Sequence, residues 1–223
     1  MNQQPLEISV QGAHTVRVVP ERATLNFAIG FEATSPVEAV DRTTELVRAI
    51  QAELDALKAT GAVSKLVVNP IGTRSWRPYS EAGRPLAPRY AASARLLAEF
   101  ADFKELASFT ARTGTAEGVT LGYVGWDVTD ATRKAAEAEA LAAAVATTQA
   151  RATAIAAAAG LTEVQATQFA DPGLLTENAS AKAGRMMSAA YGARGAAPMG
   201  EAFEISPEDI EITVALQGRF LAR

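Results

Sequence analysis

The chain has 223 residues, of which 48% are hydrophobic, and its 21 Lys and Arg against 25 Asp and Glu give a formal net charge of −4. It contains no cysteine, which excludes disulfides, thiolate nucleophiles and metal centres held by cysteine. A mildly acidic chain with scattered basic residues lacks the positive stripe that binds phosphate backbones, so we expect no nucleic-acid partner. No apolar run approaches the ~20 residues of a membrane-spanning helix, so we expect no transmembrane segment.

The amino terminus bears on the compartment of the protein. Residues 1–5 carry neither the basic region nor the apolar region that define a secretory signal peptide. We therefore expect a cytoplasmic protein. The alternative is a periplasmic or secreted protein whose signal peptide has been removed, because a cysteine-free chain folds equally well in reducing and oxidising compartments.

The first hundred residues alternate apolar and polar side chains with the two-residue period of strands, and one amphipathic helix interrupts them. The helix is expected to begin at Ser35, an N-cap with Pro36 at the first helical position and Glu38 at the capping-box position, and to end near Gly61. A turn is expected at residues 12–14. The predicted strands are residues 6–11, 16–31 with an irregularity at Pro20, 65–79 and 89–100, of which the last two form a long hairpin.

The second half of the chain is dominated by an alanine-rich helix. Asp102 is expected to cap a short helix over residues 103–113, and Asp130 a longer one over residues 131–159. Sixteen of the 29 residues of the longer helix are alanine, so neighbouring elements must approach its backbone closely. Its few larger apolar residues are Leu141, Val145 and Ile155. The predicted strands of this half are residues 119–128, 161–169 and 210–221.

The order of predicted elements indicates the fold class. The order β-β-α-β-β-α-β-α-β-β predicts an α+β protein with three helices and a mixed or mostly antiparallel sheet, because strands and helices do not alternate as in a doubly wound nucleotide fold. Residues 171–200 are rich in Gly, Ala, Met and Ser without a sustained period, so we expect a long loop or an arm there. The length fits a single domain over residues 1–223.

Residues that could carry out catalysis are few. His14 is the only histidine, and without a second histidine or a cysteine it forms no metal pair, so we expect a polar turn residue. Carboxylates near the carboxyl end could serve acid–base catalysis or bind calcium or magnesium, but solvated charges at the start of a strand are the favoured interpretation. These carboxylates are Glu201, Glu204, Glu208, Asp209 and Glu211.

Motifs of known catalytic and cofactor sites are also missing. The sequence has no phosphate-binding glycine loop and no Gly-x-Ser-x-Gly elbow. We therefore expect that the protein is not an enzyme and has no cofactor and no metal site. A hydrolase that uses the carboxylates around Glu208 is the least favoured alternative.

Two segments combine residue types that suit contact surfaces. Trp76 and Tyr79 lie among arginines near the expected hairpin tip. Aromatic and basic residues together can stack on nucleobases. In an acidic chain a structural or subunit-contact role is favoured. Met186, Met187 and Tyr191 lie in the 171–200 segment, and pliable methionines suit an adaptable contact surface, with an ordinary loop as the alternative. These five residues are the candidate interface residues.

Short motifs occur in a fixed order along almost the whole chain. They include Ile-Ser-Val-Gln-Gly at residues 8–12, Arg-Tyr-Ala-Ala at 89–92, Gln-Ala-Arg-Ala at 149–152 and Ile-Ser-Pro at 205–207 before an alternating strand. Further motifs lie at residues 18–23, 36–39, 57–61, 73–79 and 159–161. Together they resemble the SIMPL-domain family, a bacterial group catalogued as a domain of unknown function. The chain departs from the family at His14, Arg89 and Glu208, where glycine is usual.

The resemblance implies a SIMPL-like α+β domain without an established set of catalytic residues. Members are often periplasmic or associated with the outer membrane, some are linked to oxidative-stress tolerance, and some assemble into ring-like or channel-like homo-oligomers. We therefore expect a non-enzymatic, homo-oligomeric scaffold protein with a role in stress. The resemblance supports this expectation, and so do the alanine-rich helix, the methionine-rich segment and the missing catalytic motifs. The alternative is a binding module for a small ligand or a protein partner.

Overall fold

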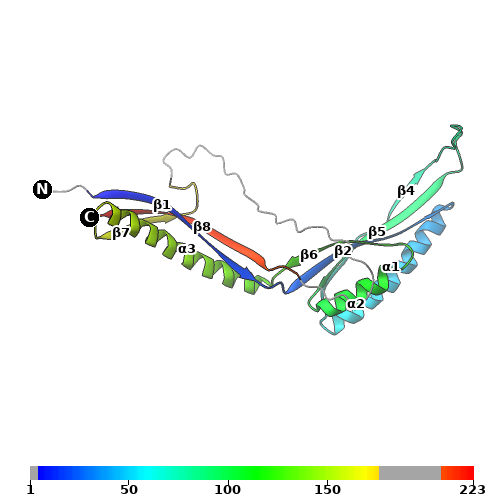
Figure 1. Ribbon diagram of the computed structural model, residues 1–223. Coiled ribbons are helices and arrows are strands. Elements are labelled where there is room, and N and C mark those ends of the chain that lie inside the picture. The colour runs from blue at the N-terminus through cyan, green and yellow to red at the C-terminus, as the bar shows by residue number, and fades with distance from the viewer. Residues whose placement is uncertain (1–4, 176–206) are drawn as a thin grey trace. The chain divides into compact units, whose positions relative to one another are not determined.

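The computed structural model describes residues 5–175 and 207–223. These residues form three helices and eight strands in the order β-β-α-β-β-β-α-β-α-β-β (Figure 1). Every pair of neighbouring strands is antiparallel, and the predicted α+β class is confirmed. The expected loop or arm over residues 171–200 lies outside the described residues from residue 176 onward.

The described residues divide into two compact units. Residues 19–128 and 207–208 form the central unit, and residues 5–18, 129–175 and 209–223 form the terminal unit. Each unit has its own sheet and its own buried core. The expectation of a single domain over residues 1–223 stays a prediction.

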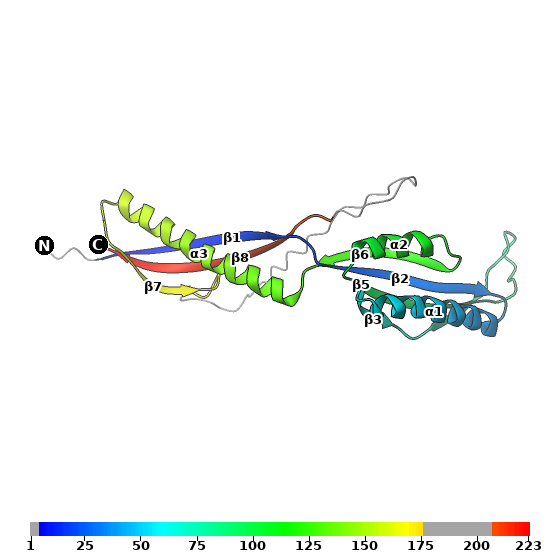
Figure 2. The ribbon, with the colours of Figure 1, turned by 90° about the horizontal axis from the view of Figure 1, so that it is seen from below.

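The terminal unit is a three-stranded sheet with a long helix packed along it (Figure 2). Its strands are β1 (Leu6–Val18), β8 (Ile210–Ala222) and β7 (Val164–Ala170), in the order β1-β8-β7. Helix α3 (Asp130–Ala158) packs against β1 and β8. The central strand is therefore β8, and every residue of β1 has a partner in it without a shift of register.

Gly12 lies inside β1, opposite Leu216, and the predicted turn at residues 12–14 is wrong. A Cβ atom at Gly12 would lie 2.8 Å from the carbonyl oxygen of Ala144 in α3, closer than packed atoms allow. Glycine at this position therefore permits the close approach of the helix and does not bend the chain. His14 lies in the same strand, opposite Val214, with its side chain exposed.

Helix α3 packs on the sheet through small side chains at every fourth position. The predicted close approach of its neighbours is confirmed, because a Cβ atom at Gly218 in β8 would lie 2.8 Å from Cγ2 of Thr148. The larger apolar residues Leu141 and Ile155 do not face this core and are 48% and 41% exposed. The buried positions of α3 are Ala136, Ala140, Ala144, Thr148, Ala152 and Ala156.

The central unit is built on a five-stranded sheet. Helices α1 (Pro36–Ala59) and α2 (Phe103–Thr113) share one buried cluster with the apolar side chains of this sheet, so both cover the same face (Figure 1). The ring of Phe109 in α2 is fully buried, with its centroid 5.9 Å from that of Phe27 and 5.7 Å from that of Phe100. The strands run in the order β3 (Val63–Val68), β5 (Arg89–Phe100), β2 (Arg22–Ala33) and β6 (Val119–Asp127), and β4 (Gly72–Trp76) also pairs with β5.

Two predicted strands are each divided in the structure. The predicted strand over residues 65–79 is β3 followed by β4, which pair in succession with β5 on either side of Pro70. Proline has no N–H group to donate to a ladder, which accounts for the break. The predicted stretch over residues 16–31 contains the end of β1 and most of β2, and these two strands belong to different sheets.

Helix starts were mostly placed correctly by local signals. The side chain of Asp102 accepts hydrogen bonds from the backbone N–H groups of Lys104 and Glu105, at 2.8 and 3.3 Å, as predicted for an N-cap. Ser35 is the N-cap of α1, but its side chain makes no capping hydrogen bond, so the expected capping box does not form. The N-cap of α3 is Thr129 and not Asp130.

Candidate functional site

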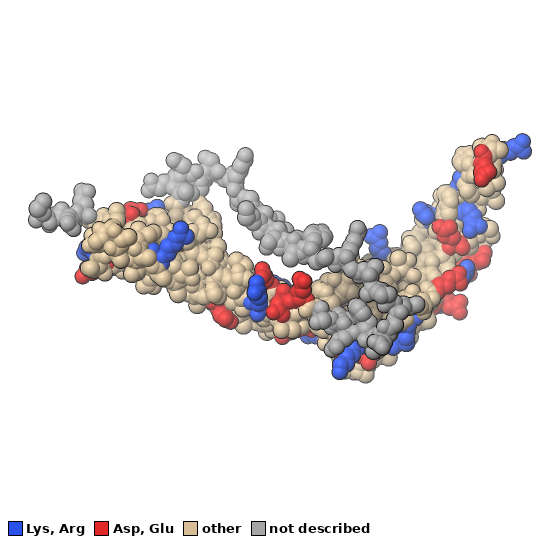
Figure 3. Space-filling model, in the orientation of Figure 1, with Lys and Arg blue, Asp and Glu red and all other residues tan. Residues whose placement is uncertain are grey.

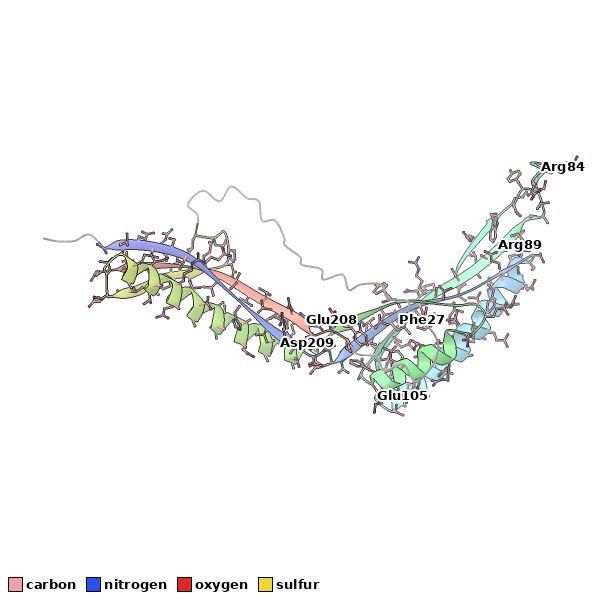
Figure 4. The ribbon with its side chains drawn as sticks, viewed as in Figure 1. Phe27, Arg84, Arg89, Glu105, Glu208 and Asp209 are labelled. Carbon is pink, nitrogen blue, oxygen red and sulfur yellow. The ribbon has the colours of Figure 1, made fainter. Side chains whose placement is uncertain are left out.

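The candidate interface residues that the structure describes lie together near the connection between β4 and β5. Trp76 is half-buried at the end of β4, opposite Arg89, and the guanidinium carbon of Arg74 lies 4.8 Å from its ring centroid. Tyr79 is 69% exposed and forms an isolated bridge with Pro85. Figure 4 places Arg84 at the outer end of this connection. The other three candidates, Met186, Met187 and Tyr191, lie outside the described residues.

An open groove of about 510 Å³ lies beside these residues in the central unit. It is formed by the first turns of α1, by β4 and by the start of β5, and Val37 on its rim is 65% exposed. Asp41 and Arg74 place opposite charges on its walls, and Arg74 also forms an ion pair of 3.6 Å with Glu32. The lining residues are Pro36, Val37, Val40, Asp41, Thr73, Arg74, Ser75, Tyr90 and Ala91. A mainly apolar groove with a few polar groups is typical of a site for a small amphiphilic ligand or a short peptide.

The described carboxylates near the carboxyl end do not gather into a catalytic pair. Glu208 and Asp209, labelled in Figure 4, are both exposed. Glu211 forms an ion pair with Arg17 across the β1–β8 ladder, at 2.9 Å. Glu201 and Glu204 lie outside the described residues, and the part of the chain that is described contains no group of three acidic, histidine or cysteine side chains able to hold a metal ion.

The outer edge of β1 carries backbone groups that no described strand pairs with, because the sheet order places β8 on its other side only. Three contacts show which residues of β1 direct their backbone N–H and C=O groups outward. The hydroxyl oxygens of Thr15 and Thr213 lie 2.8 Å apart, Arg17 binds Glu211 directly opposite, and the hydroxyl of Thr167 donates to the carbonyl of Arg219 on the β7 side. Close side-chain contact across a pair is typical of the non-hydrogen-bonded positions of an antiparallel ladder. The odd-numbered residues of β1 therefore direct their N–H and C=O groups away from β8.

A second groove follows this edge, with a volume of about 570 Å³. It is lined by the β1 segment from Ser9 to Ala13 and, on α3, by Arg151 and Ile155. A guanidinium nitrogen of Arg151 donates a hydrogen bond of 3.3 Å to the carbonyl oxygen of Gln11, which is consistent with that carbonyl pointing outward. This edge was not predicted from the sequence, because the predicted strand ended at residue 11 whereas β1 continues to Val18. The alternation that continues through Val16 and Val18 is the signal that could have found it.

The surface of α3 opposite the sheet is rich in alanine, with Gln149 and Thr153 among the exposed residues. Two residues after each buried position stands another alanine, and these alanines are all exposed. Between Ala140 and Thr162 the sequence carries a single charged residue, Arg151. Few charged side chains are visible over this part of the molecule in Figure 3, where acidic and basic residues elsewhere are interspersed. The exposed alanines are Ala138, Ala142, Ala146, Ala150, Ala154 and Ala158.

Comparison with known protein families shows to which family the chain belongs. Residues 8–220 match the family described as "SIMPL: Protein of unknown function (DUF541)". The chain belongs to the SIMPL family. No curated protein matches the chain at a significant level. Among the described residues of this SIMPL protein, no helix is long and apolar enough to cross a membrane.

The structure brings two of the short sequence motifs into contact. The motif at residues 8–12 lies in β1 and that at residues 149–152 lies in α3, and they meet where Arg151 binds the carbonyl of Gln11. Of the positions where the resemblance led us to expect glycine, His14 is exposed in β1, Arg89 begins β5 and Glu208 is exposed. The family assignment supplies no catalytic residues, so the absence of enzymatic activity stays a prediction.

Proposed function

We propose that this SIMPL protein is a non-enzymatic scaffold that works by assembling with copies of itself. The observation that carries the proposal is that α3 has a row of small residues on each of two opposite faces, of which its own sheet covers one. An apolar helix face is usually buried against another element. The face of α3 that the described residues leave exposed therefore favours an additional packing partner, and an assembly of identical chains supplies one.

Helix propensity alone does not account for the composition of this face. Alanine is the best helix former, but glutamate, lysine and arginine are nearly as good and would keep an exposed face soluble. The exposed ridge around Ala146 and Ala150 uses none of them. Because alanine side chains are small, a second helix can pack against such a ridge at the short end of the usual interaxial range, about 8 Å.

Light scattering of the purified chain at micromolar concentration tests the proposal. We expect an oligomer, and we expect Ala146→Glu and Ala150→Glu to reduce its size while helix content by circular dichroism stays unchanged. Ala135→Glu is the matched control, since it changes an exposed alanine of the same helix close to Lys134 and Glu137. A wild-type chain that stays strictly monomeric would contradict the proposal.

The groove in the central unit supports a second candidate function, a binding module for a small ligand or a protein partner. Its apolar walls and its two opposite charges, Asp41 and Arg74, suit an amphiphilic molecule. An environment-sensitive amphiphilic dye should show increased fluorescence with the wild type and lose it with Val37→Asp, which changes an exposed wall residue. Equal fluorescence of the two proteins would argue against this function. The stress-related role and the expected cytoplasmic location rest on the sequence alone and stay predictions.

A further inference from the structure

We propose that β1 of one chain pairs with β1 of a second copy, antiparallel and centred on Gly12, so that two terminal-unit sheets join into one. The inference rests on the proposed self-assembly and adds the surface, the partner and the register. It starts from the outer edge of β1, which is a different feature of the molecule from the alanine ridge of α3.

β1 lacks three features that normally protect an edge strand, which are short length, a bulge and interruption by proline or lysine. Natural edges are short, bulged, or interrupted by proline and lysine, because an exposed regular edge pairs with other strands. β1 has 13 residues, contains neither proline nor lysine, and pairs with β8 without any register shift. The edge strands β3, β6 and β7 are shorter, and each has a register shift in its ladder, while β4 pairs regularly with β5 but has only 5 residues.

The backbone geometry of β1 suits a pair with a second copy of itself. The odd-numbered residues of β1 present their N–H and C=O groups outward, so an antiparallel partner must oppose odd residues to odd residues. A pair centred on Gly12 satisfies this condition and overlaps the whole of Leu6–Val18. Its six odd residues on each strand would form about twelve backbone hydrogen bonds.

This register brings complementary side chains together. Glu7 comes opposite the partner's Arg17, and by symmetry Arg17 comes opposite the partner's Glu7, so both charged pairs are complementary. On the face that packs against α3, Ile8 comes opposite the partner's Val16, which extends the apolar surface across the junction. The two Gly12 residues meet at the two-fold axis, where the absence of side chains permits close approach.

The two α3 helices of the proposed pair would fit side by side. A two-fold axis perpendicular to the joined sheet places both α3 helices on the same face, antiparallel and side by side. Neighbouring strands are about 4.8 Å apart, so helices set back from the junction would lie near the 8–10 Å of packed helices. The groove along the edge, lined by Arg151 and Ile155, would be filled by the partner. Gln11 would exchange the 3.3 Å contact with Arg151 for a backbone hydrogen bond to the partner's Ala13.

A cysteine experiment tests the register, because the natural chain contains no cysteine. Ser9→Cys and Thr15→Cys change exposed residues that the proposed register places opposite each other. Their Cα atoms would be about 5.5 Å apart, within the range of a disulfide. We expect a mixture of the two variants to form disulfide-linked dimers under mild oxidation. Each variant alone is the control, since two Ser9 positions would lie about 20 Å apart along the strands.

A pair of proline variants tests the edge independently. Ala13→Pro removes an outward N–H group of β1 and leaves the β1–β8 hydrogen bonds intact. Ala215→Pro is the matched control. Ala215 lies directly opposite Ala13 in β8, and its N–H group points within the plane of the sheet away from β1. We expect sedimentation analysis to show self-association weakened at least about tenfold by Ala13→Pro, through the loss of two hydrogen bonds per dimer, and little changed by Ala215→Pro.

The outcomes separate this inference from the proposed function. Cross-linking of the mixture together with selective weakening by Ala13→Pro supports the β1–β1 pair. An oligomer that persists in Ala13→Pro, without cross-linking of the mixture, would overturn the pair and leave the scaffold proposal standing with another surface. A wild-type chain that is monomeric would overturn both. If Ala13→Pro does not fold, the cysteine mixture still decides the question.

Discussion

Thr148 of α3 lies so close to Gly12 of β1 that a Cβ atom on the glycine would be 2.9 Å from the backbone nitrogen of Thr148. The Thr148 hydroxyl is fully buried there and donates a hydrogen bond of 2.7 Å to the carbonyl of Ala144, so this polar group is satisfied inside its own helix. The contact holds the helix tightly against the edge strand of the terminal unit. The proposed two-fold axis passes through the same position in β1, where an added side chain would meet α3.

Gly12→Ala should lower the free energy of unfolding by about 1–3 kcal/mol, because the added methyl group meets the backbone of α3, which has little room to move. Urea denaturation followed by circular dichroism measures the change. Gly125→Ala is the control, since the nearest atom to its added Cβ, the carbonyl oxygen of Thr24, lies 4.0 Å away. Equal stability of the two variants would contradict the close packing of α3 on β1.

Reversing the charge of Glu7 should weaken self-association by about three- to tenfold at low salt, because each dimer then contains two like-charged pairs with Arg17. Adding Arg17→Glu to Glu7→Arg should restore association. Within one chain the double variant places like charges beside Arg219 and beside Glu211, so the recovery must come from contacts between chains. Sedimentation at two salt concentrations measures the effect, and a double variant weaker than either single variant would contradict the proposed register.

Phe109→Ala should destabilise the protein by about 3–5 kcal/mol, because it removes a fully buried ring that contacts Phe27 and Phe100. Tyr123→Ala removes an aromatic side chain that is 73% exposed, and its effect should stay within about 0.5 kcal/mol. Denaturation midpoints measured with urea compare the two. A small loss for Phe109→Ala would mean that the centre of the central unit is not packed around this ring.

Asp102→Ala should cost about 1 kcal/mol, because two backbone N–H groups at the start of α2 lose their acceptor. Ser35→Ala should cost less, since the Ser35 side chain makes no capping hydrogen bond at the start of α1. Thermal unfolding of both variants beside the wild type provides the comparison. A larger loss for Ser35→Ala would reverse the assignment of the two caps.

Local signals in the sequence predicted the helices well, because the chemistry of a helix end lies within a few residues. Asp102 caps α2, Pro36 begins α1 and Gly61, with a φ of 84°, follows its end, as expected from residue type and spacing. The composition of the alanine-rich helix likewise predicted that neighbouring strands pack closely on it, and Gly12 and Gly218 do so. The N-cap of α3 differs from the prediction by one residue, since Thr129 and Asp130 are both capping residue types.

The candidate site depended on contacts that no local pattern contains. Trp76 and Tyr79 were predicted near a hairpin tip and lie there, whereas the groove beside them also requires the start of α1, far away in the sequence. The free edge of β1 was missed because glycine serves two purposes. At Gly12 it suggested a turn, but it is needed for the close approach of a helix more than 130 residues later, as its contact with Ala144 shows.

By itself, the sequence determined the fold class, the three helices and most of the strands, because amphipathic periods and end signals are short-range properties of the backbone. Only the tertiary structure decided which strands pair. β1 joins β8, with Thr15 and Thr213 in contact although 198 residues separate them, while its successor β2 belongs to another sheet. Pairing at such separations depends on complementary faces and on the packing of α3, and these exist only once the chain has folded.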